Sequence, residues 1–119
     1  MAPITSVPSE VIRIVTLALD AAGLRQQAMA ANIANEGNAA YQRRAVSFEA
    51  RLRELDASSS LSGANTASLQ PRLVNDYSTA GLDRDVAAMA GNTLHFQALL
   101  KAVNAELELI GLAANDGKR

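Results

Sequence analysis

The chain has 119 residues, of which 11 are Lys or Arg and 12 are Asp or Glu, so its formal net charge is −1. This length fits one domain, and the balanced charge gives no broad attraction to nucleic acid or to an anionic membrane surface. There is no cysteine, which excludes disulfides and thiolate metal ligands. With only two Tyr and two Phe, a core of small aliphatic side chains buries little area per residue. We therefore expect stability to come from assembly with other chains.

Two prolines, Pro3 and Pro8, interrupt the first eight residues, and this composition indicates a flexible leader over 1–8. Apolar and small side chains then recur every three or four residues, which predicts a helix over 9–36. Gly37 and its asparagine neighbours tolerate the left-handed conformation that ends a helix. The apolar seam of this N-helix comprises Ile14, Leu17, Ala21, Leu24, Ala28 and Ala31.

The leader lacks the charged start and the hydrophobic segment of a cleavable secretory signal. No apolar run reaches the roughly 20 residues that a membrane-spanning helix needs. If the protein leaves the cytoplasm, we therefore expect another export route to carry it.

The middle segment, 37–81, is expected to hold a loop, one short helix and an extended arm. Phe48, Leu52 and Leu55 stand at helical spacing and predict a helix from about 47 to 56, with Ser47 as N-cap and Glu49 four residues ahead of Arg53. Residues 68–77 suit an extended conformation, but Pro71 limits them to an edge strand or a free arm.

The longest predicted element is a C-helix over 82–114, with Asp83 as N-cap and Asp85 in the first turn beside the positive helix end. Its apolar positions alternate at spacings of four and three, which is typical of a coiled coil. The seam comprises Leu82, Val86, Met89, Thr93, Phe96, Leu100, Val103, Leu107, Ile110 and Ala114. At 1.5 Å per residue this helix runs roughly 50 Å, longer than a compact domain of this size needs.

Together these elements predict an all-α fold in which the long N-helix and C-helix pack as a coiled-coil hairpin, with an irregular middle segment. The side chains expected to carry assembly are the large ones of both seams, namely Ile14, Leu17, Leu24, Val86, Met89, Phe96, Leu100, Val103, Leu107 and Ile110.

No arrangement of side chains in the sequence points to catalysis. His95 is the only histidine, so neither a Ser-His-Asp triad with a spare base nor a multi-histidine metal site is expected. The basic cluster of the middle segment is interleaved with Glu49, Glu54 and Asp56, which indicates a solvated or partner-facing surface. Its members are Arg43, Arg44, Arg51 and Arg53. We expect no enzyme activity, no catalytic residue, no metal and no cofactor.

Residues 32–48 contain a motif that is similar to the signature of bacterial flagellar rod and hook proteins. The motif consists of Asn32, Ile33, Ala34 and Asn35, then Tyr41, and Phe48 seven residues later. The family's usual Thr-Pro-Gly turn is replaced here by Asn38-Ala39-Ala40. The C-helix also resembles the family's C-terminal helix, with Leu82-Asp83-Arg84-Asp85 followed by Met89, Asn92, Phe96 and Gln97.

The resemblance implies a structural subunit of the flagellar basal-body rod, and the short length points to the proximal rod. It implies export by the flagellar type III apparatus without a cleaved signal peptide, followed by helical assembly in the periplasm. The implied partners are copies of the chain, other rod proteins, basal-body ring or adaptor components and the export apparatus, with no nucleic acid and no small-molecule substrate.

Two other classes stay open. An inner-rod-like component of a virulence-type III secretion system would share the long helices, but it is not expected to keep the Asn-Ile-Ala-Asn and Tyr-to-Phe pattern. A cytoplasmic helical adaptor or chaperone would instead be a small closed oligomer. Finding the protein in an extracted basal body would separate these classes.

Overall fold

The computed structural model describes residues 6–57, 66–79 and 81–117 of the chain. The molecule is elongated, with principal extents of 63 × 29 × 17 Å. In chain order its elements are α1 (Ser6–Ala34), β1 (Arg44–Ser47), α2 (Glu49–Ala57), the 3-10 helix η1 (Thr66–Leu69), β2 (Arg72–Asn75) and α3 (Leu82–Asp116).

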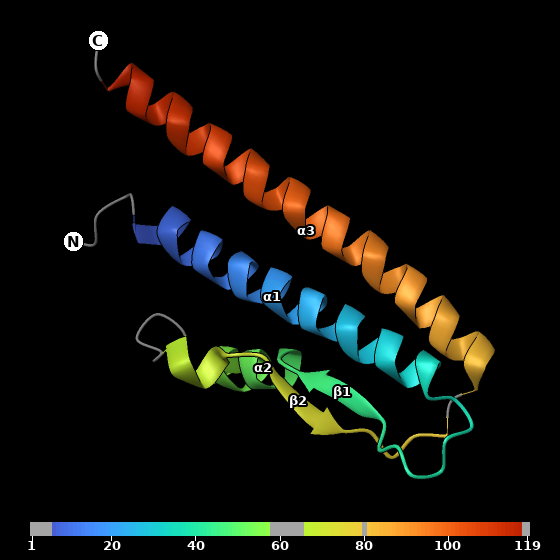
Figure 1. Cartoon of the computed structure of the whole chain (residues 1–119). Coiled ribbons are helices and arrows are strands. Elements are labelled where there is room, and N and C mark those ends of the chain that lie inside the picture. Colours follow the sequence, from blue (N-terminus) through green and yellow to red (C-terminus); the bar gives the residue numbers. More distant parts are fainter. Residues whose placement is uncertain (1–5, 58–65, 80, 118–119) are drawn as a thin grey trace.

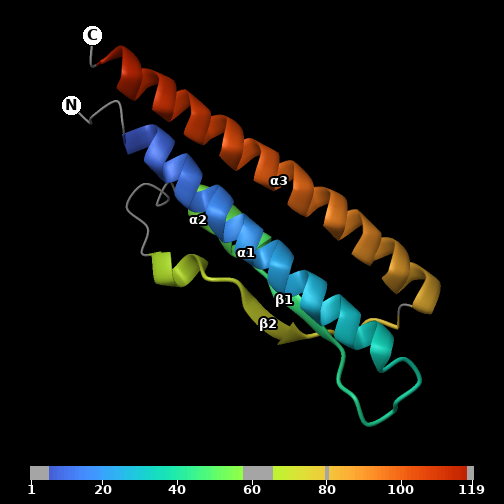
Figure 2. The ribbon, with the colours of Figure 1, turned by 45° about the horizontal axis from the view of Figure 1, so that its top comes forward.

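The long helix α1 forms the middle layer of the fold. Figures 1 and 2 show α3 along one side of α1, running in the opposite direction, and the segment with β1, α2 and β2 along the other. Two long helices thus dominate as predicted, but the small sheet means that the fold is not all-α. The expected hairpin is also incomplete as a description, because α1 packs on two sides.

The helix ends differ from the expected ones by a few residues. Helix α1 includes Ser6 to Pro8, which were expected in the leader, while 1–5 lie outside the described residues. Gly37 has φ of 84° just after α1, where a residue without Cβ is favoured. Helix α3 extends to Asp116, and its N-cap is Gly81, which makes no side-chain cap bond, rather than Asp83.

The middle segment is more regular than predicted because β1 and β2 pair as an antiparallel hairpin, with Val46 opposite Leu73. Pro71 immediately precedes β2, so the missing N–H lies just before the ladder and β2 is an edge strand. Ser47 belongs to β1 and is not the cap of the short helix. Instead, the Phe48 carbonyl accepts the first hydrogen bond, from the Leu52 N–H at 3.1 Å.

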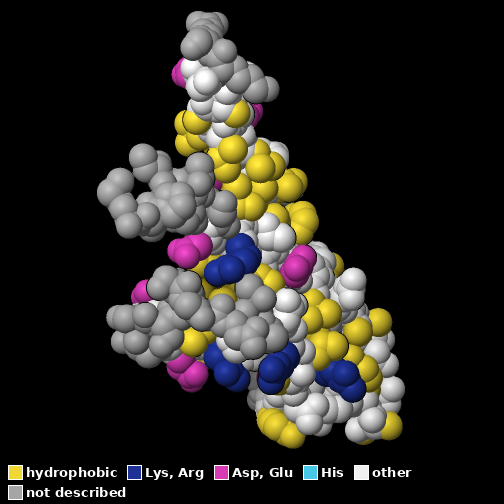
Figure 3. Space-filling model, turned by 90° about the vertical axis from the view of Figure 1, so that its left-hand side faces the viewer, with side chains coloured by type: hydrophobic (Ala, Val, Ile, Leu, Met, Phe, Trp, Pro, Cys, Tyr) yellow, Lys and Arg dark blue, Asp and Glu magenta, His cyan; other side chains and the backbone are white. Residues whose placement is uncertain are grey.

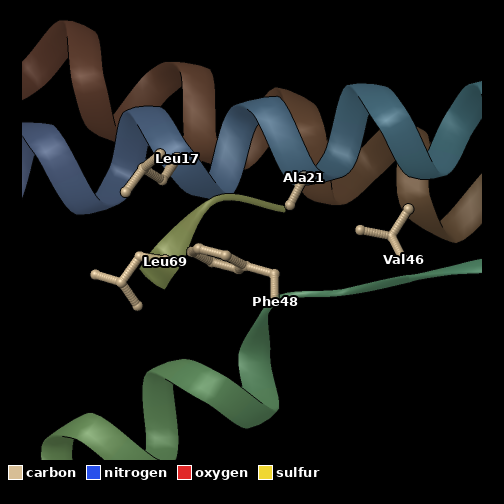
Figure 4. Packing of buried hydrophobic residues seen from close by; sticks show 5 residues of the cluster. All are labelled: Leu17, Ala21, Val46, Phe48 and Leu69. Carbon is tan, nitrogen blue, oxygen red and sulfur yellow. The ribbon is translucent and has the colours of Figure 1, made fainter. Parts of the chain in front are cut away.

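The hydrophobic core lies between α1 and this middle segment. In Figure 4 the ring of Phe48 lies between Leu69 of η1 and the α1 side chains Leu17 and Ala21. Phe48 is only 3% exposed. Leu17 and Leu24 were expected to face the C-helix, and this expectation is corrected because both pack against the core cluster on the opposite side of α1.

The core position of Phe48 gives a first prediction. Phe48→Ala should lower the free energy of unfolding by about 3–5 kcal/mol, because it removes a buried ring and leaves a cavity. Urea unfolding followed by circular dichroism measures the loss. Phe96→Ala is the matched control, since Phe96 is more than a third exposed, and it should cost about 1 kcal/mol. Equal losses for the two variants would contradict this description of the core.

Candidate assembly interface

The covered residues of α3 form one regular row. They recur at spacings of four, three and seven, which is the heptad pattern of a helix packed along a second helix. The row comprises Asp85, Met89, Asn92, Leu99, Val103 and Glu106. Only Met89 and Val103 belong to the seam expected from the sequence, so the real contact surface lies to one side of the predicted one.

The rest of the predicted seam is exposed. Val86, Leu100 and Leu107 follow one another at spacings of seven or fourteen on the flank of the covered row, and each is 43–50% exposed. We call these three residues the open row of α3. Figure 3 shows hydrophobic side chains gathered along the long helices on the face that it draws. The apolar face of α3 is therefore wider than the strip that α1 covers.

Asn92 fixes the rotation of α3 against α1. Its Nδ2 donates hydrogen bonds to the Ala22 carbonyl of α1 at 2.9 Å and to Gln26 Oε1 at 2.7 Å. Gln26 in turn donates to Thr93 Oγ1 at 3.1 Å. Asn92 is 7% exposed, and a buried amide stripped of these partners costs about 1–3 kcal/mol. A polar residue at a seam position thereby sets the register of the two helices.

A charged pair joins the start of α3 to the hairpin. Arg43, just before β1, donates two parallel hydrogen bonds to Asp85, at 2.7 and 2.8 Å. Asp76, just after β2, lies 3.5 Å from the same guanidinium. Arg43 was expected on a solvated or partner-facing surface and Asp85 beside the helix dipole, yet both side chains are at most 20% exposed and pair with each other. The cluster therefore joins the start of β1, the end of β2 and the first turn of α3.

The cluster shifts the ionisation of its members. The hydrogen bonds from Arg43 hold the pKa of the Asp85 carboxyl below its usual value and raise the pKa of the guanidinium. The pKa of Asp76 is also lowered, chiefly because the Ser78 backbone N–H donates to its carboxylate at 2.9 Å. All three groups are thus charged over the whole neutral range.

Asn32, the first residue of the motif in 32–48, links α1 to β1 by hydrogen bonds. Asn32, 4% exposed, donates through Nδ2 to the Arg44 carbonyl at 2.8 Å, and its Oδ1 accepts from the Arg44 N–H at 3.0 Å. The side-chain amide thereby pairs with the outer edge of β1 as a neighbouring strand would. Arg25 adds a hydrogen bond to the Val46 carbonyl at 3.2 Å and one to Glu49 at 2.8 Å. Glu49 therefore pairs with α1 and not with Arg53.

The other motif residues have varied positions. Asn35 donates to the Ala31 carbonyl at 2.8 Å and helps to end α1. Tyr41 is half-buried beside a shallow groove of about 340 Å³ that Leu24, Ala28 and Leu73 also line. Ile14 and Ile33 are half-buried, whereas Leu82, Ala34, Phe96, Gln97 and Ile110 are exposed.

Sequence reasoning missed the residues that connect separate elements. No periodic pattern in the sequence marks Gln26, Arg25 or Arg43, because their partners lie 21 to 67 positions away along the chain. The only available signal was the recurrence of polar residues, Asp85, Asn92 and Glu106, at multiples of seven within a row that also holds apolar side chains.

The described residues were compared with the requirements of a metal site and of a membrane-spanning helix. No three His, Cys, Asp or Glu side chains within them gather as a metal site requires. No helix among them is long and apolar enough to cross a bilayer. His95 is exposed on α3.

Comparison with known proteins adds no relative. No family model matches the chain, and no curated protein matches it.

The Arg43–Asp85 pair gives a second prediction. Asp85→Asn should lower the free energy of unfolding by about 2 kcal/mol at pH 7, because two charge-assisted hydrogen bonds are lost. Since the pKa of Asp85 is lower in the folded state, its stabilisation is fully present above the unfolded value of about 4 and is lost as the pH falls through the folded value. The gap between wild type and variant should therefore narrow as the pH falls below about 4.

Urea unfolding at several pH values measures this gap. Asp83→Asn makes the same change two residues earlier, on an exposed side chain, and should alter stability by less than about 0.5 kcal/mol at every pH. A gap that does not narrow as the pH falls below about 4, or equal losses for the two variants at pH 7, would contradict the role given to the pair.

Proposed function

We propose that the protein is a structural subunit of a bacterial flagellar basal-body rod, most similar to the proximal rod protein FlgB. It would be exported by the flagellar type III apparatus and would pack in the periplasm with its own copies, other rod proteins and basal-body ring or adaptor components. The sequence basis is the motif from Asn32 to Phe48, together with the start of α3.

The observation that carries the proposal is the open row of α3. Burying a leucine fully contributes about 1.5–3 kcal/mol, and here Leu100 and Leu107 keep half of that area in water although they lie beside a helix contact. A stripe of apolar side chains along one flank of a long helix is the surface on which another helix packs. Such a stripe favours a subunit that completes its packing with neighbours.

The shape of the molecule supports repeated side-by-side packing. It is a slab of 63 × 29 × 17 Å with both long helices near its long direction. A contact between unlike faces of identical copies generates a helical tube when it does not close. The open row of α3 would supply one such face.

The experiment places a charge in the open row. Leu100→Asp would leave an unpaired carboxylate in an apolar contact, which should weaken association by about 100-fold or more. In the bacterium that encodes the chain, cells with this variant should export the subunit, fail to complete the rod and not swim. Motility assays, electron microscopy of extracted basal bodies and blots of the periplasmic fraction measure these outcomes.

Leu94→Asp is the matched control. Leu94 is 68% exposed and lies on another side of α3, about 120° around the helix from Leu100. Cells with this variant should swim. If Leu100→Asp cells assemble rods and swim like the parent, the open row is not an assembly surface. If the wild-type protein stays in the cytoplasm as a closed oligomer, the adaptor class replaces the rod proposal.

A further inference from the structure

The two-stranded sheet has one closed edge and one open edge. Asn32 covers the outer edge of β1 by bonding both backbone groups of Arg44. On the other strand, the Asp76 N–H donates a hydrogen bond to the Arg43 carbonyl at 2.9 Å. This bond fixes which residues of β2 direct their backbone groups toward β1, because the direction alternates from one residue to the next. Antiparallel pairing then directs the backbone groups of Leu73 and Asn75 away from β1.

The open edge is accessible. Within 6–57, 66–79 and 81–117, the N–H and C=O groups of Leu73 and Asn75 have no hydrogen-bond partner. Figures 1 and 2 show β2 on the side of β1 that faces away from α1 and α3. All four residues of β2 are exposed. Such an edge is a template for a further strand.

We infer that the β2 edge pairs with the β2 edge of a second copy of this chain, antiparallel, about a two-fold axis at Val74. In this register Leu73 lies opposite Asn75 of the second copy, and each pair exchanges both of its open backbone bonds. The two sheets then become one continuous four-stranded sheet. A two-fold contact of this kind uses the same patch on both copies.

Charge selects this register over its neighbours. Centring on Val74 places Arg72 opposite Asp76 of the second copy, and the symmetry repeats the pair at the other end. Arg72 is exposed and belongs to no ion pair among the described residues, while Asp76 keeps about a quarter of its side chain exposed. If the two-fold axis lay at Leu73, Arg72 would lie opposite Val74 of the second copy. If the axis lay at Asn75, Asp76 would lie opposite Val74. Opposite charges across strands stabilise pairing.

Apolar side chains fit the same register. Val74, 42% exposed, meets Val74 of the second copy at the axis. Tyr77, 80% exposed, lies opposite Pro71 of the second copy, where its ring can cover the pyrrolidine. Pro71 has no N–H, so the new ladder ends there.

This pairing does not rest on the proposed function. It closes on itself, whereas a rod grows by contacts that do not close. The paired form therefore belongs to the unassembled protein, and it uses a surface separate from the open row of α3. With only short strands in contact, the dimer should be weak, with dissociation in the micromolar range or above.

Disulfide trapping tests the geometry in the full chain, which has no cysteine of its own. Val74→Cys places two thiols across the axis, with Cα atoms about 4.5 Å apart, within disulfide range. Ala45→Cys is the control, because Ala45 is the neighbour of Val74 on β1 and its copies would be three strand spacings, or about 14 Å, apart. At about 0.1 mM under mild oxidation, Val74→Cys should give mainly covalent dimer and Ala45→Cys should stay monomeric. A monomeric Val74→Cys, or equal cross-linking of both variants, would overturn the inference.

Charge exchange tests the register independently. Arg72→Asp and Asp76→Arg each create like-charge pairs across the axis, and each alone should dimerise at least tenfold more weakly than wild type in sedimentation equilibrium. An equimolar mixture restores both opposite-charge pairs and should recover dimerisation to within about threefold. A mixture no better than the single variants would refute this register. Leu100→Asp should leave this dimer unchanged, which separates the β2 contact from the proposed rod contact.

Discussion

Two polar side chains decide which side of α3 faces α1, and the rest of the structure depends on that choice. Asn92 gives its amide hydrogens to α1, and Asp85 neutralises Arg43. Turning α3 so as to bury Leu100 would gain roughly 1 kcal/mol per half-covered leucine. It would also leave the Arg43 guanidinium without its main partner, at a cost of about 2 kcal/mol, and the buried Asn92 amide without its partners, at a cost of about 1–3 kcal/mol. The polar contacts therefore prevail over the larger apolar side chains.

The protein therefore has two surfaces, of different kinds, that have no partner among the described residues. The open row of α3 lacks apolar cover, and the edge of β2 lacks hydrogen-bond partners. A helix face accepts neighbours at several crossing angles, since the packing of apolar side chains has little directionality. A strand edge accepts only a strand in a defined register, because each hydrogen bond is directional. The two surfaces can therefore discriminate between partners in different ways.

Much of the fold follows from local patterns in the sequence. Periodicity alone predicts two long helices, and the glycine and asparagine residues around Gly37 predict the end of the first. Pro71 allows an edge strand and nothing more central, which agrees with β2. Local rules suffice at these places because the responsible interactions join residues a few positions apart.

The arrangement of the elements did not follow from those rules. Leu17 and Leu24 show that α1 has an apolar face, but the same period suits a helix partner and a sheet partner equally. On α3 the sequence offers two flanking rows, and hydrophobicity favours the one with Leu100 over the one with Asn92. The choice reverses because Asn92 finds Ala22 and Gln26 across 66 or more residues. Such long-range polar pairs leave no periodic signal, and Glu49, which pairs with Arg25 and not with its helical neighbour Arg53, is a further example.

The adjacent alanines of α1 have a consequence for the freedom of the sequence to vary. Ala21 packs toward Phe48 and Ala22 toward α3, and neither has any exposed surface. Because one methyl group fills each space, a larger side chain at either position would push a neighbouring layer outward, and overpacking of this kind costs about 1–3 kcal/mol. The separations between α1 and the layers on its two sides depend on two of the smallest side chains in the chain. We therefore expect homologous chains to keep small residues at these two positions.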